Sequence, residues 1–306
     1  MSVKSTSRVM MLVILVALIL AIIYPFLSRY QASFLTSIFT YLTLTIGWSI
    51  FSGYTGYISL ATSAFFGIGA YTAIFAIPIM PFPLAFALGG VVSAAVGLLV
   101  GLVTLRLKGL YFMIFSFVLN FFAQNLFLYG IFANRETAGI ILSPVSDEVI
   151  YYSLLIAAFG AIATSAWMRR SLYGLALASI GQDELKAEVV GLNTTLFKIV
   201  ALCMSATFIG VAGAISIQRF YYIDPYVAFS LRNTFEPVIM AIVGGAGTFL
   251  GPVFGAITIG CASELFVTRF PLYYQLFLGL LLVLFVVFAP KGITGTDWLT
   301  KLRKRS

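Results

Sequence analysis

Runs of apolar residues, most of them close to the roughly 20 residues that a helix needs to cross a bilayer, recur along the whole sequence. They occupy residues 9–27, 34–51, 61–77, 84–105, 109–132, 149–168, 197–217, 234–243, 252–266 and 272–289. With 61% hydrophobic and only 9% charged residues, the chain lacks the polar surface that a water-soluble fold needs. The sequence therefore predicts an all-α polytopic membrane protein, with one helical bundle over residues 1–306.

Basic residues beside these runs set the predicted orientation. Arg169 and Arg170 end one run, and a basic tail occupies residues 291–306. Because positive charge marks the cytoplasmic ends of membrane helices, about ten transmembrane segments would place both termini in the cytoplasm of a multi-pass protein of the cell membrane. The run at 234–243 is short, which predicts that some segments are broken or half-helices. The excess of positive charge at cytoplasmic helix ends also accounts for the net charge of +8, so no nucleic-acid partner is predicted.

A glycine-rich stretch from Gly53 to Tyr71, GYTGYISLATSAFFGIGAY, interrupts the apolar pattern. It combines four glycines and seven hydroxyl side chains with no charge, and membrane-spanning patterns flank it. Backbone that leaves helical geometry at membrane depth persists only inside protein or along a cavity. A second cluster, GGAGTFLGPVFGA, follows at Gly244 to Ala256. The two clusters are typical either of an internal repeat around a transport site or of close helix packing through small residues.

Several kinds of chemistry are excluded by composition. The chain has no histidine, and its two cysteines, Cys203 and Cys261, lie apart in apolar runs, so neither a histidine-dependent triad nor a metal site is predicted. No nucleophile and base stand at a credible spacing, so the chain is not expected to be an enzyme. It also lacks a G-x-x-x-x-G-K-[ST] motif, so no cofactor is expected here and any ATP would bind to separate subunits.

Charge is scarce within the predicted spans. Glu264 has Arg269 five residues further on, which favours an interfacial or paired position. Glu236 fits a position near a substrate as well as one at the lipid headgroups. Ion-coupled carriers keep intramembrane charges for ion or proton handling, and this sequence offers few.

The segment from Ser171 to Asn193 is the amphipathic one, and it predicts a short cytoplasmic helix. Its polar face carries Asp183, Glu184 and Glu188 against a single lysine. Helices that lie on lipid usually have a basic polar face, so an acidic face favours a protein partner. The region over residues 169–195 is therefore predicted to be a coupling loop.

Four stretches together resemble the permease subunits of ABC importers for branched-chain amino acids, specifically the M-type Liv permeases, a family that includes subunits for urea and short amides. GYTGYISLATSAFFGIGAYTA is similar to the family's GxxGQxSLGHAAFFGIGAYTA signature, and RLKGLYFMIFSFVLN to its LRGxYFAxxTLAF segment. SLYGLALASIGQDELKAEVVGLNTTLFKIVAL resembles its cytoplasmic stretch, and AIVGGAGTFLGPVFGA its late glycine motif. The chain has Tyr57 and Thr62 where the family usually has Gln and His.

The resemblance implies a transmembrane permease subunit of an ATP-driven importer for branched-chain or related amino acids. Its implied partners are cytoplasmic ATPase subunits, a sister permease, an extracytoplasmic substrate-binding protein, the small-molecule substrate and the lipid bilayer. The implied ATPase-coupling residues are Gly174, Asp183, Glu184, Glu188 and Gly191. The predicted pathway residues are Gly53, Tyr54, Gly56, Tyr57, Ser59, Thr62, Phe66, Gly67, Gly69, Tyr71, Asn120, Gly244, Gly245, Gly247 and Gly251. The alternative that remains is a self-sufficient facilitator or secondary carrier for small polar or amphipathic solutes.

Overall fold

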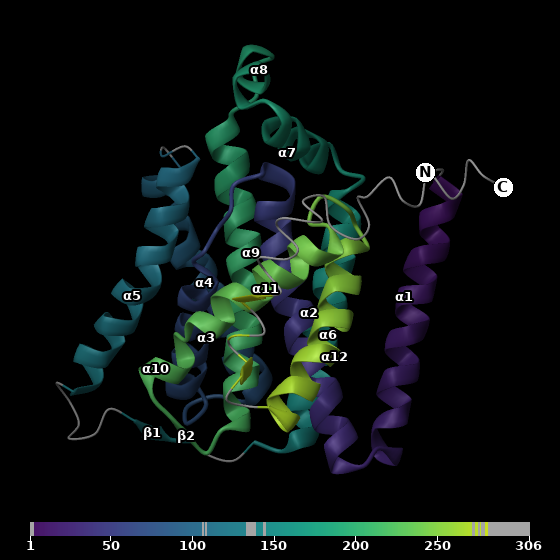
Figure 1. Cartoon of the computed structure of the whole chain (residues 1–306), viewed down its shortest axis with the longest axis vertical. Helices are drawn as coiled ribbons and strands as arrows, with labels where there is room; N and C mark the ends of the chain where they lie inside the picture. The colour runs from purple at the N-terminus through teal and green to yellow at the C-terminus, as the bar shows by residue number, and fades with distance from the viewer. Residues whose placement is uncertain are drawn as a thin grey trace.

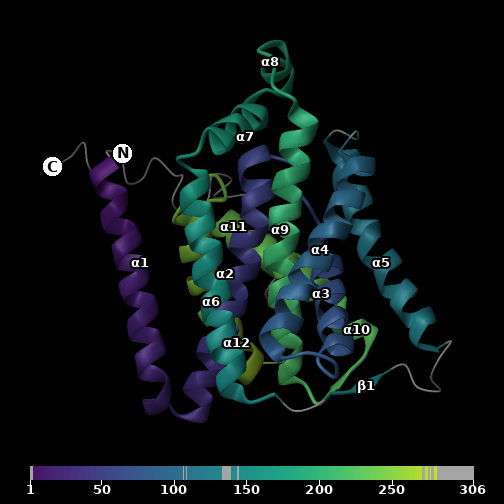
Figure 2. The same ribbon diagram turned by 180° about the vertical axis from the view of Figure 1, so that it is seen from behind.

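The computed structural model describes residues 3–105, 107, 109–132, 139–142, 145–270, 273–274, 276 and 279–280, with the backbone alone for residues 3–12 and 131–132. The structure is a bundle of helices whose long axes run between two ends (Figures 1 and 2). Helices α7 (Leu172–Gln182) and α8 (Glu184–Val189) project from one end, where α1 (Val3–Ile23) also begins. Strands β1 (Ile140–Ile141) and β2 (Tyr222–Ile223), paired antiparallel, lie at the opposite end.

The remaining elements are η1 (Tyr24–Phe26), α2 (Arg29–Thr55), α3 (Thr62–Ala76), α4 (Phe82–Thr104), α5 (Leu110–Phe132), α6 (Asp147–Met168), α9 (Thr194–Ser216), η2 (Ile217–Arg219), α10 (Pro225–Ala228), α11 (Leu231–Gly244) and α12 (Gly251–Arg269). Within the described residues, six helices are long and apolar enough to cross a membrane, namely α2, α4, α5, α6, α9 and α12. The predicted class, an all-α polytopic membrane protein, is confirmed. The short β1–β2 pair was not predicted.

Helix α2 lies at the centre of the bundle and α5 at its edge. In the most apolar part of α2, 83% of the residues are buried, against 22% in α5. The side chains of Ile114, Val118 and Phe122 on α5 are exposed, and apolar side chains on the outside of such a bundle suit contact with lipid tails. The central position of α2 brings its glycine-capped end into contact with several other helices.

Helices α3, α4 and α9 pack closely because small residues line their contacts. A Cβ atom added at Gly69 would collide with the backbone of Gly210, and one added at Gly89 would lie 2.8 Å from the Ala214 side chain. Membrane helices approach this closely only through small residues. For Gly69, the structure therefore favours the packing interpretation of the glycine cluster over a place on a pathway.

Helix α2 ends at Gly56, whose φ of +71° is a left-handed conformation that suits glycine. The chain then turns back along α2 in an extended stretch, residues 57–61, before α3 begins. Trp48 Nε1 of α2 donates to the Ser59 carbonyl at 2.7 Å, and the Ser59 amide donates to Ser52 Oγ at 3.1 Å. Helix α3 therefore begins partway along the bundle, as the prediction of broken segments anticipated.

Two polar residues of α5 satisfy the backbone groups at this break. Asn120 Nδ2 donates to the Leu60 carbonyl at 2.6 Å, and Asn120 Oδ1 accepts the Ala64 amide of the first turn of α3 at 2.9 Å. One turn earlier, Ser116 Oγ accepts the Leu60 amide at 2.9 Å. Asn120 is 1% exposed, so water cannot replace these bonds. Side chains from α5 thus make an interrupted backbone stable at membrane depth.

The second glycine cluster forms a similar break. Helix α11 ends at Gly245, with φ +103°, and residues 246–250 connect it to α12. Ser49 Oγ of α2 donates to the Ala246 carbonyl at 3.3 Å, and Gly53 leaves the space that this carbonyl occupies. Arg169 Nη2 donates to the Gly247 carbonyl at 2.7 Å. The two clusters, far apart in sequence, therefore meet near the end of α2.

The predicted helix over Ser171 to Asn193 is two helices. Asp183 has extended backbone (φ −160°, ψ 102°), and its carboxylate accepts the Lys186 amide at 3.2 Å as the N-cap of α8. The amphipathic pattern of the sequence continues without interruption through Asp183, the residue that caps α8. The pattern alone therefore predicted one helix and not two. The predicted last span at 272–289 lies largely outside the described residues, and the basic tail at 291–306 lies wholly outside them.

Replacing Asn120 by leucine tests whether its side chain holds the break together. The variant leaves the Leu60 carbonyl and the Ala64 amide without their partner, and each buried unsatisfied group costs about 1–3 kcal/mol. We expect a clearly lower midpoint of thermal unfolding for the purified chain in nanodiscs. Asn125→Leu is the matched control, since exposed Asn125 bonds, within the described part of the chain, only to the Phe121 carbonyl of its own helix. Equal midpoints for the two variants would contradict this role.

Candidate functional site

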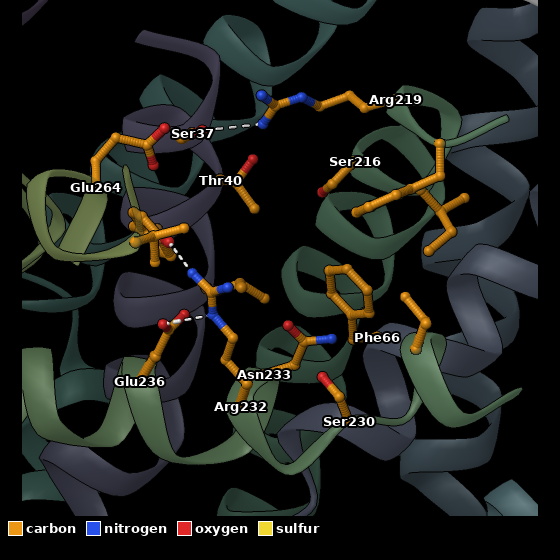
Figure 3. A pocket seen from close by; sticks show the side chains of 16 residues that line it. Ser37, Thr40, Phe66, Ser216, Arg219, Ser230, Arg232, Asn233, Glu236 and Glu264 are labelled. Carbon is orange, nitrogen blue, oxygen red and sulfur yellow. Dashed lines mark hydrogen bonds and ion pairs between the residues drawn. The ribbon is translucent and has the colours of Figure 1, made fainter. Parts of the chain in front are cut away.

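A polar cavity of about 490 Å³ lies among α2, α3, α9, α11 and α12 (Figure 3). Several of its residues come from the first half of α2 and the end of α9, which lie toward the β1–β2 end of the bundle (Figure 1). Its wall combines charged, hydroxyl and amide side chains with apolar ones. The polar members are Ser37, Thr40, Ser216, Arg219, Ser230, Arg232, Asn233, Glu236 and Glu264, and the others are Tyr41, Leu44, Phe66, Ile217, Phe220, Val227 and Val267. The volume is in the range of small-molecule pockets, about 300–1,000 Å³.

Two of the four charged residues form a pair on α11. Arg232 Nε donates to Glu236 Oε1 at 2.7 Å, one helical turn away, and Arg232 Nη2 donates to the Tyr41 hydroxyl at 3.0 Å. The Tyr274 hydroxyl also bonds to Glu236, and the guanidinium of Arg232 lies 4.6 Å from the centre of the Tyr274 ring. Glu236 is 3% exposed, so it lies inside the protein rather than at the lipid headgroups.

The other two charges are Arg219, from η2, and Glu264, from α12. Arg219 donates to Ser37 Oγ at 3.0 Å and to Ser33 Oγ at 2.8 Å, both on α2. Among the described residues, neither Arg219 nor Glu264 forms an ion pair within 4.0 Å. The sequence predicted either an interfacial position for Glu264 or an ion pair with Arg269. Glu264 does not pair with Arg269 and instead lines the cavity.

Of the predicted pathway residues, Phe66 lines this cavity. Its neighbours in sequence have packing roles: a Cβ at Gly67 would collide with the Phe229 ring, and Tyr71 stacks on Phe127 and Phe229 with ring centres 4.8 and 6.0 Å apart. The hydroxyl of Thr62 is buried with no hydrogen-bond partner among the described residues. This part of the cluster therefore lies behind the cavity wall.

The other predicted residues lie at or near the two breaks. Tyr54 donates through its hydroxyl to the Ser165 carbonyl of α6 at 3.2 Å. Gly244 and Gly251 approach each other so closely that a Cβ at Gly244 would collide with the backbone of Gly251. Gly53 makes the contact between the end of α2 and the break after α11, whereas Gly56 lies against Gly181 of α7 and the Gly247 carbonyl accepts Arg169. The structure thus separates the glycines of the two clusters from the polar cavity, which only Phe66 of the predicted pathway residues lines.

The arginines of the cavity were not among the predicted site residues. Arg232 stands four residues before Glu236, a spacing that places opposite charges on one helix face. This spacing was present in the sequence, but the predicted span began at residue 234 and therefore left Arg232 out. Arg219 offered no local signal, because its serine partners lie more than 180 residues away in sequence.

At the α7–α8 end, Glu184 is the centre of an internal network. Its carboxylate accepts Lys198 Nζ at 2.5 Å through Oε1 and the Tyr57 hydroxyl at 2.5 Å through Oε2. Lys198 Nζ also lies 4.6 Å from the centre of the Tyr57 ring. The Lys198 side chain is 1% exposed and that of Glu184 is 14% exposed. This buried network joins α8 to α9 and to the extended stretch that leads into α3.

The other predicted coupling residues shape the two short helices. Glu188 Oε1 accepts the Thr194 hydroxyl at 3.0 Å. Asp183 pairs with Lys186 at 2.9 Å, and hydrogen bonds from Lys186 lower the pKa of the Asp183 carboxyl. Gly191 has φ +92° and ends α8 in a Schellman motif, and Gly174 allows α7 to approach the Met168 carbonyl. These residues fix the shape of the α7–α8 projection.

The exposed surface of this projection carries apolar side chains beside its charged ones, which the sequence-based expectation did not include. Glu184 turns toward Lys198, and exposed Glu188 accepts the Thr194 hydroxyl, whereas Leu185, Val189 and Val190 are 67%, 88% and 82% exposed. Hydropathy patterns define the faces of a helix but not which face meets the rest of the protein. A partner that docks here would meet an apolar surface at the tip.

An apolar bundle with two glycine-capped breaks and a charged internal cavity is the architecture of a polytopic membrane transport protein. The family model "Branched-chain amino acid transport system / permease component" matches residues 30–286. The chain belongs to this family, and it is a multi-pass membrane protein whose relatives are transport permeases rather than enzymes.

Three curated relatives illustrate the similarity. The high-affinity branched-chain amino acid transport system permease protein LivM of Salmonella typhimurium is 27% identical, covering 92% of this chain and 74% of the relative. LivM of Escherichia coli is 27% identical over 90% of this chain and 73% of the relative. BraD of Pseudomonas aeruginosa, another permease protein of such a system, is 24% identical over 86% and 94% of the two chains. No solved structure shows a significant match to this chain.

Removing the positive charge of the buried network tests its contribution to stability. Lys198→Met leaves Glu184 buried without its ion-pair partner, which costs about 3–5 kcal/mol in buried pairs. We expect a large fall in the midpoint of thermal unfolding. The double variant Lys198→Met with Glu184→Met should recover most of this loss, because no buried charge remains. Additive losses in the double variant would contradict the ion-pair interpretation.

Proposed function

We propose that the chain is the transmembrane permease subunit of an ATP-driven importer for branched-chain or related amino acids. Its membership of the permease family supports this role, and the sequence contains no P-loop of its own. ATP would bind to separate ATPase subunits in the cytoplasm. The observation that carries the proposal is the α7–α8 projection, whose exposed apolar tip is tied through Glu184 to the interior of the bundle.

The proposed topology has about ten crossings with both termini in the cytoplasm. Residues 57–61 together with α3 would make one crossing, and α10 together with α11 would make another. Neither α3, with 15 residues, nor α11, with 14, is long enough as a helix to cross the bilayer by itself. The last crossing, at 272–289, falls largely outside the described residues. In this orientation the α7–α8 projection and the start of α1 face the cytoplasm, with basic Arg169 and Arg170 at the same end.

The proposed partners follow from the two ends of the bundle. An ATPase subunit would receive the projection, the core of a coupling loop over residues 169–195, in a groove of apolar character. A substrate-binding protein would dock at the β1–β2 end, nearer the polar cavity. A sister permease subunit would complete the membrane part, and all of residues 1–306 would form one transmembrane domain. The basic tail at 291–306, outside the described residues, would remain in the cytoplasm.

The contacts suggest how movement of the ATPase would reach the cavity. Displacing α8 pulls on Tyr57 through Glu184, and Tyr57 begins the extended stretch that leads into α3. Helix α3 carries Phe66 on the cavity wall. The contact between Gly53 and Ala246 passes the same movement to α11, which carries Arg232 and Glu236. The two breaks would act as hinges in an alternating-access cycle.

A charged residue at the tip of the projection tests the coupling proposal. Val189→Asp places a carboxylate on the apolar surface, and we expect loss of ATPase binding and of ATP-driven leucine uptake in proteoliposomes that contain the assembled importer. Gln182→Ala is the control, because it changes an exposed polar residue at the end of α7 without altering the apolar tip or the Asp183–Lys186 pair. Uptake that stays at the wild-type rate in Val189→Asp would refute the assigned coupling surface.

The self-sufficient carrier is tested with the same materials. Proteoliposomes that hold this chain alone should show no leucine flux, with or without an ion gradient, because the proposed energy source is absent. Flux that saturates with leucine in that preparation would overturn the importer assignment and support a facilitator or secondary carrier.

A further inference from the structure

The cavity holds four charges in a membrane protein whose spans are otherwise almost free of charge. A charge at membrane depth is costly and usually faces a functional site or a partner charge. Arg232 and Glu236 form an ion pair in which each charge compensates the other, and Tyr41 and Tyr274 form further hydrogen bonds with this pair. This pair needs no ligand. The other two charges differ from this pair: Arg219 is an exposed residue of η2, just beyond α9, Glu264 is partly exposed in the last third of α12, and they do not form an ion pair with each other.

Arg219 is held in place by neutral partners. Its guanidinium donates to the hydroxyls of Ser33 and Ser37 and to the Ser33 carbonyl at 3.4 Å, all on α2. These bonds fix the orientation of the guanidinium, and no carboxylate among the described residues lies within 4.0 Å of it, although Asp147 lines the second cavity beside it. Since the planar guanidinium carries five N–H donors, further donors remain for a carboxylate group. Arg219 thus presents an oriented positive charge to the cavity.

Glu264 presents the opposite charge. It lines the same cavity, is partly exposed, and its carboxylate forms no hydrogen bond or ion pair with a described residue. It lies close enough to Arg219 to act on it electrostatically, but the two do not approach within 4.0 Å. Figure 3 shows both side chains on the Ser37 side of the cavity. Two opposite charges that do not pair leave room for a ligand between them.

We propose that this cavity binds a zwitterionic amino acid, with Arg219 holding the carboxylate and Glu264 the ammonium group. The apolar side chain of the ligand would lie against Leu44, Phe66 and Ile217 on the cavity wall. A zwitterion satisfies both charges at once and leaves the cavity neutral. A neutral amide would leave both unpaired, and a molecule with a single charge would leave one unpaired.

The consequence is that the permease itself contributes to substrate selection. The inference rests on the proposed function, since it assigns substrate contacts to a path through this chain. It also makes Arg219 and Glu264 specificity-determining residues, although neither lies in the glycine clusters. A substrate delivered at the β1–β2 end would meet Arg219 early, because Arg219 also lines a second cavity of about 480 Å³ beside η1 and the start of α2.

The test measures binding of three probes to the purified full chain in nanodiscs by saturation-transfer NMR. L-leucine carries both charges, L-leucinamide lacks the carboxylate, and 4-methylpentanoate lacks the ammonium group. We expect the wild type to bind leucine about tenfold more tightly than either analogue, because each analogue loses one hydrogen bond to a charged group and a loss of about 1.4 kcal/mol weakens binding tenfold. Equal binding of the three probes, or no binding of leucine, would overturn the proposal.

The variants assign each charge to its residue. Arg219→Gln should lower leucine binding about tenfold, to the level of leucinamide, and leave leucinamide binding unchanged. Glu264→Gln should lower leucine binding to the level of 4-methylpentanoate and leave that probe unchanged. Arg219→Lys keeps the positive charge and should restore part of the preference for leucine over leucinamide. Unaltered selectivity in both glutamine variants would overturn the assignment.

The controls separate a binding role from a structural one. Arg269→Gln and Glu148→Gln change exposed residues that line neither cavity, and they should retain wild-type selectivity. A variant that misfolds would lose binding of all three probes, whereas the proposal requires the loss of one preference only. ATP-driven leucine uptake by the assembled importer is measured alongside. Absent uptake with intact selectivity would refute the importer role alone, and normal uptake with unaltered variant selectivity would refute this site alone.

Discussion

The structure depends on satisfying backbone hydrogen bonds where a helix is interrupted inside an apolar bundle. In the hydrocarbon region no water is present to pair with a free amide or carbonyl, so an extended stretch such as residues 57–61 needs partners from the protein. Asn120 and Ser116, one turn apart on α5, bind both backbone groups of Leu60 and the first-turn amide of Ala64. With these bonds in place, α3 begins partway along the bundle, and Phe66 reaches the cavity wall.

The same extended stretch connects the interior to the cytoplasmic projection of the proposed topology. Tyr57 stands at its start and bonds to Glu184, which is held by Lys198 in a buried ion pair. A buried pair of this kind contributes little net stability compared with apolar residues, but it fixes one arrangement of the groups that it joins. Next to Tyr57 in the sequence, Gly56 lies against Gly181 of α7, and Gly53 lies against Ala246 in the break that follows Gly245. Alternating access requires a rigid connection between the projection and the bundle, which the Glu184–Lys198 pair provides. It also requires places where the helices can bend, which the two breaks provide.

The cavity has a different physical basis from the glycine clusters. Its wall is lined by one balanced ion pair, Arg232 with Glu236, and by two opposite charges that lie apart, Arg219 and Glu264. Apolar side chains such as Leu44 complete it. The glycines mainly allow helices and turns to approach closely, as at Gly69, and they set the position of the cavity without lining it.

The sequence by itself determined the all-α membrane fold, nearly every helix among the described residues and the places where two of them break, because hydropathy and glycine capping are local properties. The resemblance to a permease family was also readable from motifs. Only the tertiary structure decided that Glu184 turns inward, that Asn120 supports the break, and that Arg219 and Glu264 share one cavity. Glu184 and its partner Lys198 are 14 positions apart in the sequence, and Asn120 and its partner Leu60 are 60 positions apart. The residues of the cavity come from helices that are farther apart still. A linear pattern carries no information about which side chains such packing brings together.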